Sequence, residues 1–444
     1  MLRPSAVALT LAFPLALFAA DGDLDDTFST DGKDVQTWNG ERAFAYSVAA
    51  TADGSILVGG SVGDASDDFA VMRYRADGAI DTSFGDLGFT KVAFDIGGSE
   101  YDQLHAVVPL TSGKVLLVGQ AQTAAVFLPA VARLTAAGEL DPDFGAGGKV
   151  VFDVLPDANT EVQILDAALQ SNGMVVLLGT ATPSGGSNDR RIFLLRIDEN
   201  GSPDLTFSSD GWTLLDFPSE FNEAASALEI DSLGKIHVGG YTGLPDYRPL
   251  YARVGPTGIS QLLAVVDLDL DWVTDDLAID PVSGAVLLSL RDADFAFDAG
   301  AVVRLDIAGE LDPTFGTAGI AELALEDGSY ATAIEVQSDR KIAIAGSINH
   351  TGTQRLGFLL ARLLPDGTRD NSFDGNGVVR YEFDREVDAQ DAAFALTLSG
   401  GRIVAAGYAA LLSGHGAFAI LRTQNALIFT DGFERGSASG WLGN

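Results

Sequence analysis

The sequence predicts an all-β protein, a single seven-bladed β-propeller made of four-stranded blades of about 60 residues each. Three observations predict this fold: a repeated strand that ends in arginine, a recurrent turn motif, and glycine turns between short apolar strands. Successive strand-end arginines are 60, 63, 57, 51, 58 and 60 residues apart. Units of this size cannot each bury a hydrophobic face alone, so they must pack against one another. The seven arginines are Arg73, Arg133, Arg196, Arg253, Arg304, Arg362 and Arg422.

The turn motif reads L-D-x-x-F-G-x-x-G, as at Leu140 to Gly148 and Leu311 to Gly319. Variants of it place phenylalanines at 28, 84, 207 and 373. Glycine turns suit antiparallel hairpins, so each unit should hold four antiparallel strands. A β-solenoid would instead need shorter rungs and parallel strands. In the second unit we expect strands at His105 to Leu110, Lys114 to Gly119, Pro129 to Leu134 and Lys149 to Asp153.

The phase of the repeat predicts how the ring closes. The first L-D-x-x-F motif, Leu24 to Phe28, precedes the first inner strand, and no such motif follows Arg422. The segment Lys33 to Trp38 should therefore supply the fourth strand of the last blade.

The arginines also predict a repeated ion pair. In five units the arginine lies eight residues before the motif aspartate, so we expect a hydrogen-bonded pair that holds the turn. Closure of the ring extends the rule to Arg422 and Asp25, and a separation above about 6 Å would contradict it. An anion-binding ring of arginines is the alternative. The five local pairs are Arg73 with Asp81, Arg133 with Asp141, Arg196 with Asp204, Arg304 with Asp312, and Arg362 with Asp370.

The fourth unit departs from the pattern. Gln261 stands where the aspartate is expected, and no L-D-x-x-F motif follows Arg253. This blade edge is either eroded or specialised, and we expect erosion.

The chain divides into three parts. Residues 1–20 read as a signal peptide, because Arg3 precedes an apolar run, Ala6 to Phe18, that is too short to span a bilayer. Residues 21–424 form the propeller and residues 425–444 a tail. We therefore expect an exported protein of the medium, cell surface or periplasm. It contains no cysteine, so neither disulfides nor cysteine metal sites can form.

The charge is strongly negative, with 62 acidic against 27 basic residues and a net charge of −35. Such a surface repels nucleic acids and anionic membranes, and favours cations or basic proteins. Solubility alone is the simpler explanation of the charge. We expect a monomer with no membrane span whose partner is a protein or a glycan.

Acidic residues gather in the links that lead into each inner strand. These links should form an acidic rim around one mouth of the central channel, which leaves Ca²⁺ open as a ligand, although no EF-hand pattern is present. We single out six rim residues: Asp102, Glu161, Glu223, Asp275, Asp276 and Asp391.

No catalytic motif stands out. The four histidines lie in different units, and neither a nucleophile elbow nor a phosphate-binding loop occurs. A binding or scaffold propeller is therefore our main expectation, and an exported carbohydrate-active hydrolase or lyase with carboxylates at the channel mouth is the alternative. An enzyme should show a deep channel pocket with carboxyl or histidine groups of raised pKa, and a scaffold a broad, shallow face.

The motif turns, followed by strands such as Asp53 to Gly59, resemble the delta-60 repeat of secreted bacterial proteins. The resemblance spans roughly residues 24 to 423 and implies a β-propeller and export. It implies no activity. The tail segment Phe429 to Gly436, with Trp441, resembles short sorting endings of exported proteobacterial proteins.

Overall fold

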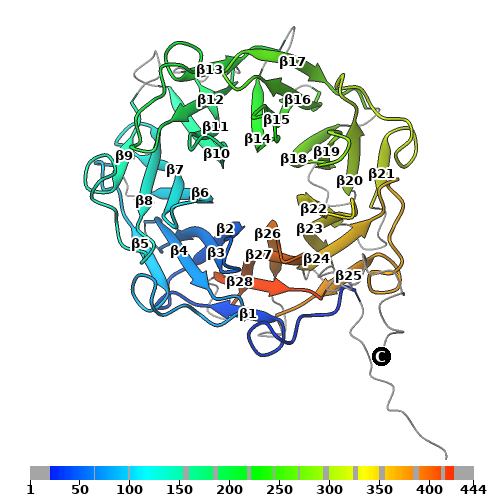
Figure 1. Cartoon of the computed structure of the whole chain (residues 1–444), viewed down its shortest axis with the longest axis horizontal. Helices are drawn as coiled ribbons and strands as arrows, with labels where there is room; N and C mark the ends of the chain where they lie inside the picture. The colour runs from blue at the N-terminus through cyan, green and yellow to red at the C-terminus, as the bar shows by residue number, and fades with distance from the viewer. Residues whose placement is uncertain are drawn as a thin grey trace, which may run out of the picture.

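Seven four-stranded antiparallel sheets stand around a common axis in the computed structural model of the protein (Figure 1). No helix is formed in the described part of the chain. The predicted signal segment and tail lie outside the described residues. These residues are 21–64, 66–98, 101–153, 160–183, 189–217, 222–243, 246–268, 271–293, 300–323, 329–349, 356–383, 390–411 and 416–424.

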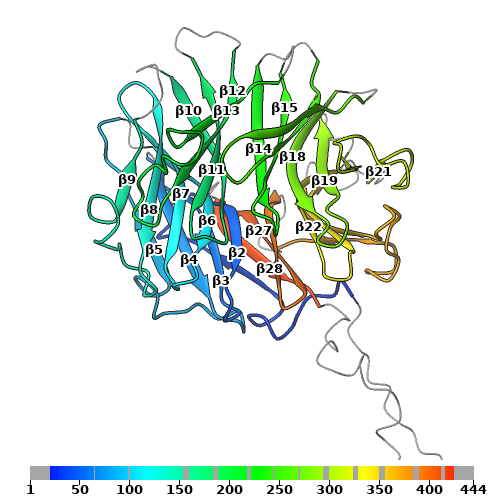
Figure 2. The same ribbon diagram turned by 45° about the horizontal axis from the view of Figure 1, so that its top comes forward.

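Each blade begins with an inner strand next to the axis and continues outward, and Figure 2 shows the strands running between loops at the two ends of the ring. The inner strands are β2 (Ala43–Ala50), β6 (Asp102–Pro109), β10 (Glu161–Leu169), β14 (Glu223–Ile230), β18 (Trp272–Ile279), β22 (Ser329–Val336) and β26 (Asp391–Ser399). The second strands are β3 (Ile56–Val62), β7 (Val115–Gln122), β11 (Val175–Thr182), β15 (Ile236–Thr242), β19 (Val286–Asp292), β23 (Ile342–Asn349) and β27 (Arg402–Ala410).

The third strands carry the repeated arginines near or at their ends, and the fourth strands form the rim of the ring. The third strands are β4 (Asp68–Tyr74), β8 (Phe127–Leu134), β12 (Arg191–Ile197), β16 (Pro249–Val254), β20 (Gly300–Leu305), β24 (Leu356–Leu363) and β28 (Gly416–Arg422). The fourth strands are β5 (Phe89–Val92), β9 (Lys149–Val151), β13 (Trp212–Leu215), β17 (Ser260–Val265), β21 (Ile320–Glu322), β25 (Val378–Tyr381) and β1 (Lys33–Gln36). Blades are numbered 1 to 7 from β2–β5 to the blade of β26, β27, β28 and β1.

The ring closes as predicted, because β1 from the N-terminal side completes blade 7. It pairs antiparallel with β28, from Lys33 opposite Leu421 to Gln36 opposite Phe418. Blade 7 therefore combines one strand from the N-terminal side of the chain with three from the C-terminal side, which converts an open array of blades into a ring with no free first or last blade.

The hydrophobic core lies between neighbouring blades. Seven clusters of buried residues each combine side chains from two adjacent blades, including a cluster across the seam between blades 7 and 1. The second strands are buried on both faces, as in β3, and consequently read as continuous apolar runs. Every blade thus depends on its two neighbours to shield its hydrophobic side chains from water.

The motif aspartate and the motif phenylalanine both contact the arginine of the third strand. In six pairs the arginine Nε donates to the aspartate Oδ2, and the guanidinium lies 4.5–4.8 Å from the centre of the motif phenylalanine ring. The Nε–Oδ2 distances are 2.7 Å for Arg73–Asp81, 2.6 Å for Arg133–Asp141, 2.8 Å for Arg196–Asp204, 2.9 Å for Arg304–Asp312, and 2.7 Å for both Arg362–Asp370 and Arg422–Asp25.

The same arginines also join neighbouring blades. Arg73 Nη1 donates to the Ala136 carbonyl at 2.8 Å, and Arg422 Nη1 donates to the Ala76 carbonyl at 2.6 Å. The arginines of the pairs are therefore committed to aspartate, aromatic and main-chain groups, so the structure gives no support to an anion-binding ring.

Blade 4 keeps four strands without the motif. A tight turn leads from β16 straight into β17, and Tyr251 and Leu262 fill the space that a motif phenylalanine fills elsewhere. A Cβ on Gly309 would lie 2.9 Å from Leu262 Cδ2, just as a Cβ on Gly138 would lie 2.8 Å from the Phe84 ring. The Tyr251 hydroxyl bonds to His237 Nδ1 at 2.8 Å. This blade edge is rebuilt around other side chains rather than left empty.

Each inner strand contains one bulge that shapes the channel. The pairing with the second strand slips by one residue at the same place in all seven blades, which leaves one extra residue facing the axis. We call these the bulge residues: Tyr46, His105, Leu165, Ser226, Asp275, Thr332 and Phe394.

Candidate binding site in the central channel

A cavity of about 330 Å³ occupies the channel at the level of the bulges. Its walls are the bulge residues and the residues that follow them, so all seven inner strands contribute. Small-molecule sites commonly measure about 300–1,000 Å³. The cavity is therefore large enough to hold a small ligand.

Five carboxyl groups line this cavity, and one of them, Asp275, pairs with Arg291. The other four come from four consecutive blades: Asp166 of β10, Glu229 of β14, Asp276 of β18 and Glu335 of β22. Asp166 and Asp276 directly follow their bulges, and Glu229 and Glu335 lie two residues further along, so the set alternates between two levels. We call these four the acidic wall. Each side chain keeps part of its surface open to the cavity while protein surrounds the rest of it.

Main-chain hydrogen bonds hold three of these carboxylates in place. Asp166 accepts from the N–H groups of Ala167 at 2.7 Å and Leu228 at 2.8 Å. Asp276 accepts in the same way from its own blade and from the next one, at 2.8 Å in both bonds. Glu229 Oε2 accepts from the Ile279 N–H at 2.7 Å. The acidic wall is therefore preorganised.

The inter-blade bond does not itself require a charge. Ser47 occupies the position of Asp166 and Asp276 in blade 1, and its Oγ accepts from the Val107 N–H of the next blade at 3.0 Å. A hydroxyl thus performs the structural task, and aspartate adds a negative charge to it. The inter-blade bond therefore does not explain why Asp166 and Asp276 carry negative charges.

Burial raises the pKa of every member of the acidic wall. It raises the pKa of Glu229 to about 8, with the charges of Glu335 and Asp166 adding to the effect. It raises the pKa of Glu335 to about 7 and that of Asp166 to about 6, and lifts the pKa of Asp276 well above its usual range. Burial therefore keeps much of the wall protonated near neutral pH, and binding of a cation in the cavity would favour the ionised carboxylates and release these protons.

Aromatic rings from the other three blades line the opposite part of the cavity. Tyr46 of blade 1 lies between His105 of blade 2 and Phe394 of blade 7, with 5.8 Å between ring centres on each side. Phe44 and Tyr408 stand behind this row, 5.3 Å apart. We call Tyr46, His105 and Phe394 the aromatic row. The cavity therefore has one charged and one aromatic side.

The six predicted rim residues do not come together as one site. Asp102, Glu223 and Asp391 open their inner strands, are buried, and accept main-chain N–H bonds from Phe94 at 2.6 Å, Phe217 at 3.2 Å and Phe383 at 3.1 Å, respectively. Glu161 is exposed at the start of β10. Asp275 faces the cavity but pairs with Arg291 at 2.8 Å. Only Asp276 belongs to the acidic wall.

Sequence reasoning missed Asp166, Glu229 and Glu335 because it examined the links between strands. The signal was present inside the strands, where each of these residues interrupts an apolar pattern. Alignment of the seven inner strands would place Asp166 with Asp276 and Glu229 with Glu335, which is the register that the bulges later revealed.

Within the described residues, no three histidine, aspartate or glutamate side chains are arranged to hold a metal ion. The described segments also contain no helix with the length and hydrophobicity that a membrane span requires.

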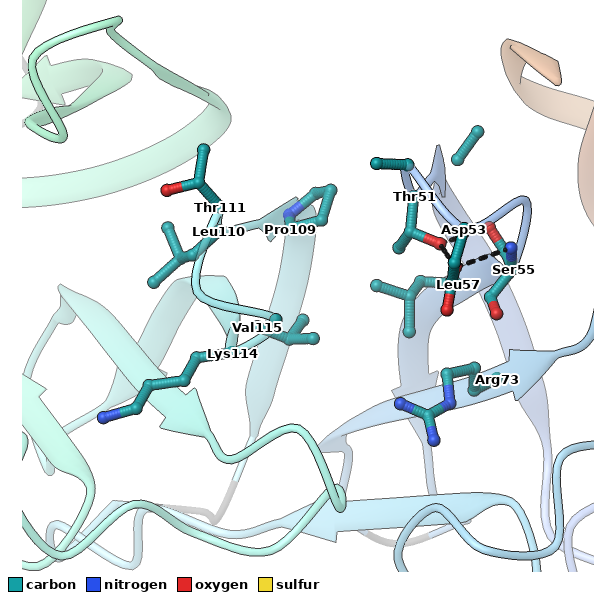
Figure 3. Close-up of a pocket in the computed structure, with 13 residues that line it drawn as sticks. Thr51, Asp53, Ser55, Leu57, Arg73, Pro109, Leu110, Thr111, Lys114 and Val115 are labelled. Carbon is teal, nitrogen blue, oxygen red and sulfur yellow. Dashed lines mark hydrogen bonds between the residues drawn. The ribbon is translucent and has the colours of Figure 1, made fainter. Parts of the chain in front are cut away.

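A second hollow of about 400 Å³ lies between the hairpins of blades 1 and 2 (Figure 3). Its charged groups are already engaged. Asp53 accepts from Thr51 Oγ1 at 2.5 Å and from the Ser55 N–H at 3.0 Å, and Lys114 Nζ lies 2.7 Å from Asp141 Oδ2. Arg73 is held by Asp81. The channel cavity is consequently the stronger candidate for a binding site.

Four segments of the chain match a known β-propeller family. Residues 51–84, 111–144, 170–207 and 337–373 match a family described as a domain of unknown function (DUF5122) beta-propeller. Each matched segment runs from the turn after an inner strand to the motif phenylalanine. Four segments of this β-propeller are therefore similar to repeats of this kind. No curated protein matches it.

Three solved structures are similar to this chain in fold alone, because each shares only 12% sequence identity with it. A polysaccharide lyase, Uly1, gives a TM-score of 0.51, with 86% of this chain and 90% of that chain covered. A protein of unknown function from Dyadobacter fermentans gives 0.48, with 72% and 93% covered. An inactive virginiamycin B lyase variant from Staphylococcus aureus gives 0.47, with 88% and 99% covered.

Proposed function

We propose that this protein is an exported, non-enzymatic binding propeller whose central channel takes a small organic cation. The observation that carries the proposal is the acidic wall, four carboxyl groups contributed to one cavity by four consecutive blades. Mutual repulsion makes such a set costly unless a positive charge neutralises it. The volume of about 330 Å³ favours a small molecule over a folded partner.

The identity of the repeat and the export of the protein belong to the same proposal. The matched segments end at the motif phenylalanine, which supports assignment to the delta-60 repeat of secreted proteins. The apolar N-terminal segment, the absence of cysteine and the net charge of −35 fit an extracellular or periplasmic location.

A binding role accounts for the channel better than a catalytic one. Raised carboxyl pKa values are the feature expected of an enzyme, but here burial raises the pKa of every carboxyl group in the wall rather than of one selected group. Both oxygens of Asp166 and of Asp276 already accept main-chain bonds. His105 lies in the aromatic row, beside Tyr46. The arrangement is suited to stabilising a positive charge.

The proposal predicts that putrescine raises the melting temperature at about pH 8.5, where more of the wall is ionised, and that its uncharged analogue butanediol does not. A ligand at about 100 times its dissociation constant stabilises the folded state by roughly 2.7 kcal/mol, which a thermal-shift assay resolves. Ca²⁺ is offered in a parallel series, since a hydrated metal ion would test the charge of the wall without the organic part of the ligand.

Two variants make this test specific. The double variant Glu229→Gln/Glu335→Gln should abolish the putrescine shift, whereas Glu161→Gln, which removes an exposed carboxylate on the same inner strand as Asp166, should preserve it. Equal shifts with putrescine and butanediol, or a full shift in the double variant, would overturn cation binding in the channel.

An exported glycan hydrolase or lyase remains a second candidate, favoured by the unequal pKa values of about 8 at Glu229 and about 6 at Asp166. Glycoside hydrolysis uses one protonated and one ionised carboxyl group. This candidate predicts release of reducing ends from a glycan panel and loss of that release in Glu229→Gln. Absence of turnover on every glycan in the panel would remove its support.

A further inference from the structure

We propose that the ligand of the channel carries a quaternary ammonium group, as choline does. This inference rests on the proposed function, because it uses the same cavity and the same acidic wall, and it adds the class of cation. The aromatic row, which cation binding alone does not require, is the observation that carries it.

The aromatic row is continuous along three adjacent blades. The planes of Tyr46 and His105 are inclined by 23°, and those of Tyr46 and Phe394 by 30°. Tyr46 is 36% exposed, which is unusual for a large ring that lies inside a channel. Phe394 and His105 also keep part of their surface open. The row therefore offers aromatic surface to whatever occupies the cavity.

Aromatic surface and carboxylates together match a methylated cation. The negative face of an aromatic ring attracts a cation, and quaternary ammonium groups are commonly recognised in this way. The methyl groups of such a cation also gain from leaving water for an aromatic wall. The acidic wall across the cavity supplies the opposite charge.

The hydrogen bonding of two members of the acidic wall, Asp166 and Asp276, favours a cation without N–H donors. A primary ammonium group must satisfy three donors when it leaves water. All four oxygens of Asp166 and Asp276 already accept a main-chain bond, so these groups offer charge more readily than new hydrogen bonds. A quaternary ammonium group needs the charge and no acceptor.

The row itself adds no opposing charge. Burial lowers the pKa of His105 to about 4, so the imidazole is neutral at physiological pH. Burial also raises the pKa of Tyr46 to about 12, which keeps its phenol neutral. The three rings present an uncharged surface beside the acidic wall.

The test compares three ligands of one skeleton by isothermal titration calorimetry on the whole protein at about pH 8.5, where the acidic wall is more ionised. Choline has a trimethylammonium group, ethanolamine has a primary ammonium group, and neohexanol is the uncharged carbon analogue of choline. We expect choline to bind about tenfold more tightly than either of the others.

Two aromatic variants complete the experiment. Phe394→Leu should weaken choline binding about tenfold and leave ethanolamine within about twofold. Phe44→Leu removes a ring of the same aromatic cluster from behind the row and should preserve the preference for choline. Tyr46→Phe keeps the ring and should also preserve the preference for choline. These two controls separate loss of aromatic surface from general damage to the channel.

The outcomes separate this inference from the proposed function. If ethanolamine binds as tightly as choline, or if Phe394→Leu weakens both equally, the quaternary class is wrong and cation binding stands. If neither cation binds, or if neohexanol binds as tightly as both, the proposed function fails as well.

Discussion

Replacing Asp25 with alanine is expected to lower the free energy of unfolding by about 3–5 kcal/mol, because it leaves a buried arginine without its partner. Asp25 is fully buried and Arg422 is 3% exposed, and their 2.7 Å bond joins the two ends of the ring. Burial opposes ionisation of Asp25, but its hydrogen bond from Thr27 and the charge of Arg422 hold its pKa below the usual value. The lost pair would weaken the seam on which every blade depends.

Asp81→Ala is the matched control for this prediction. The Arg73–Asp81 pair has the same geometry in blade 1, but its side chains are 18% and 16% exposed and it closes no seam. We expect it to cost about 1 kcal/mol. Urea unfolding followed by tryptophan fluorescence measures both variants. Equal losses in the two variants would show that the closing pair has no special importance.

The second large effect is a decrease in stability of about 3 kcal/mol as the pH rises from about 6 to about 8.5. The folded pKa of Glu229 is about 8 and that of Glu335 about 7, both because of burial, whereas the unfolded value is about 4.3. Between these values the folded state holds protons that the unfolded state has released. Rising pH therefore favours unfolding until the folded groups have lost their protons too.

The figure of about 3 kcal/mol is below the sum of the separate shifts, because the groups remain partly exposed to the cavity. The double variant Glu229→Gln/Glu335→Gln should flatten the dependence and be more stable than the natural chain at about pH 8.5. The control variant Glu161→Gln should change neither the pH dependence nor the stability at about pH 8.5. Melting temperatures across the pH range test this prediction. A natural chain that is equally stable at both ends of the range would contradict the raised pKa values of Glu229 and Glu335.

Stability should also fall under strong acid, for the opposite reason. The arginine-paired aspartates have lowered pKa values, and that of Asp370 falls to about 2, since bonds from Ser372 and Lys341 and the charge of Arg362 outweigh burial. Their contribution is complete above the unfolded value of about 3.9 and is lost as the pH falls toward 2. The pH of greatest stability thus lies between the two effects.

The repeat made most of the architecture predictable. The spacing of the arginines gave the number of blades, and the eight-residue interval to the aspartates gave the pairs, because both are local features repeated along the chain. The displaced first motif at Leu24 to Phe28 also located the closing strand, since a ring needs its missing strand from the other end. In blade 4, where the motif is absent, sequence reasoning expected erosion and did not foresee that Tyr251 and Leu262 fill the space.

The candidate site was much harder to predict. Asp276 was singled out, but as part of a rim in the links. Of the other five rim residues, Asp275 also lines the cavity but pairs with Arg291, and the remaining four lie elsewhere. Asp102 illustrates the reason: it is acidic and precedes an inner strand, yet it is buried against a main-chain N–H of the preceding blade. A charge pattern along the chain cannot distinguish a carboxylate that holds a loop from one that faces a cavity.

By itself, the sequence determined the fold class, the seven blades, the arginine pairs and the way the ring closes, because each follows from local periodicity and from the need to pair every strand. Only the tertiary structure decided which side chains meet. One bulge in each inner strand turns a residue toward the axis and brings Asp166, Glu229, Asp276 and Glu335 into one cavity opposite Tyr46 and Phe394. Side-chain direction in a strand reverses with every residue, so a slip of one residue in each blade determines what the channel contains.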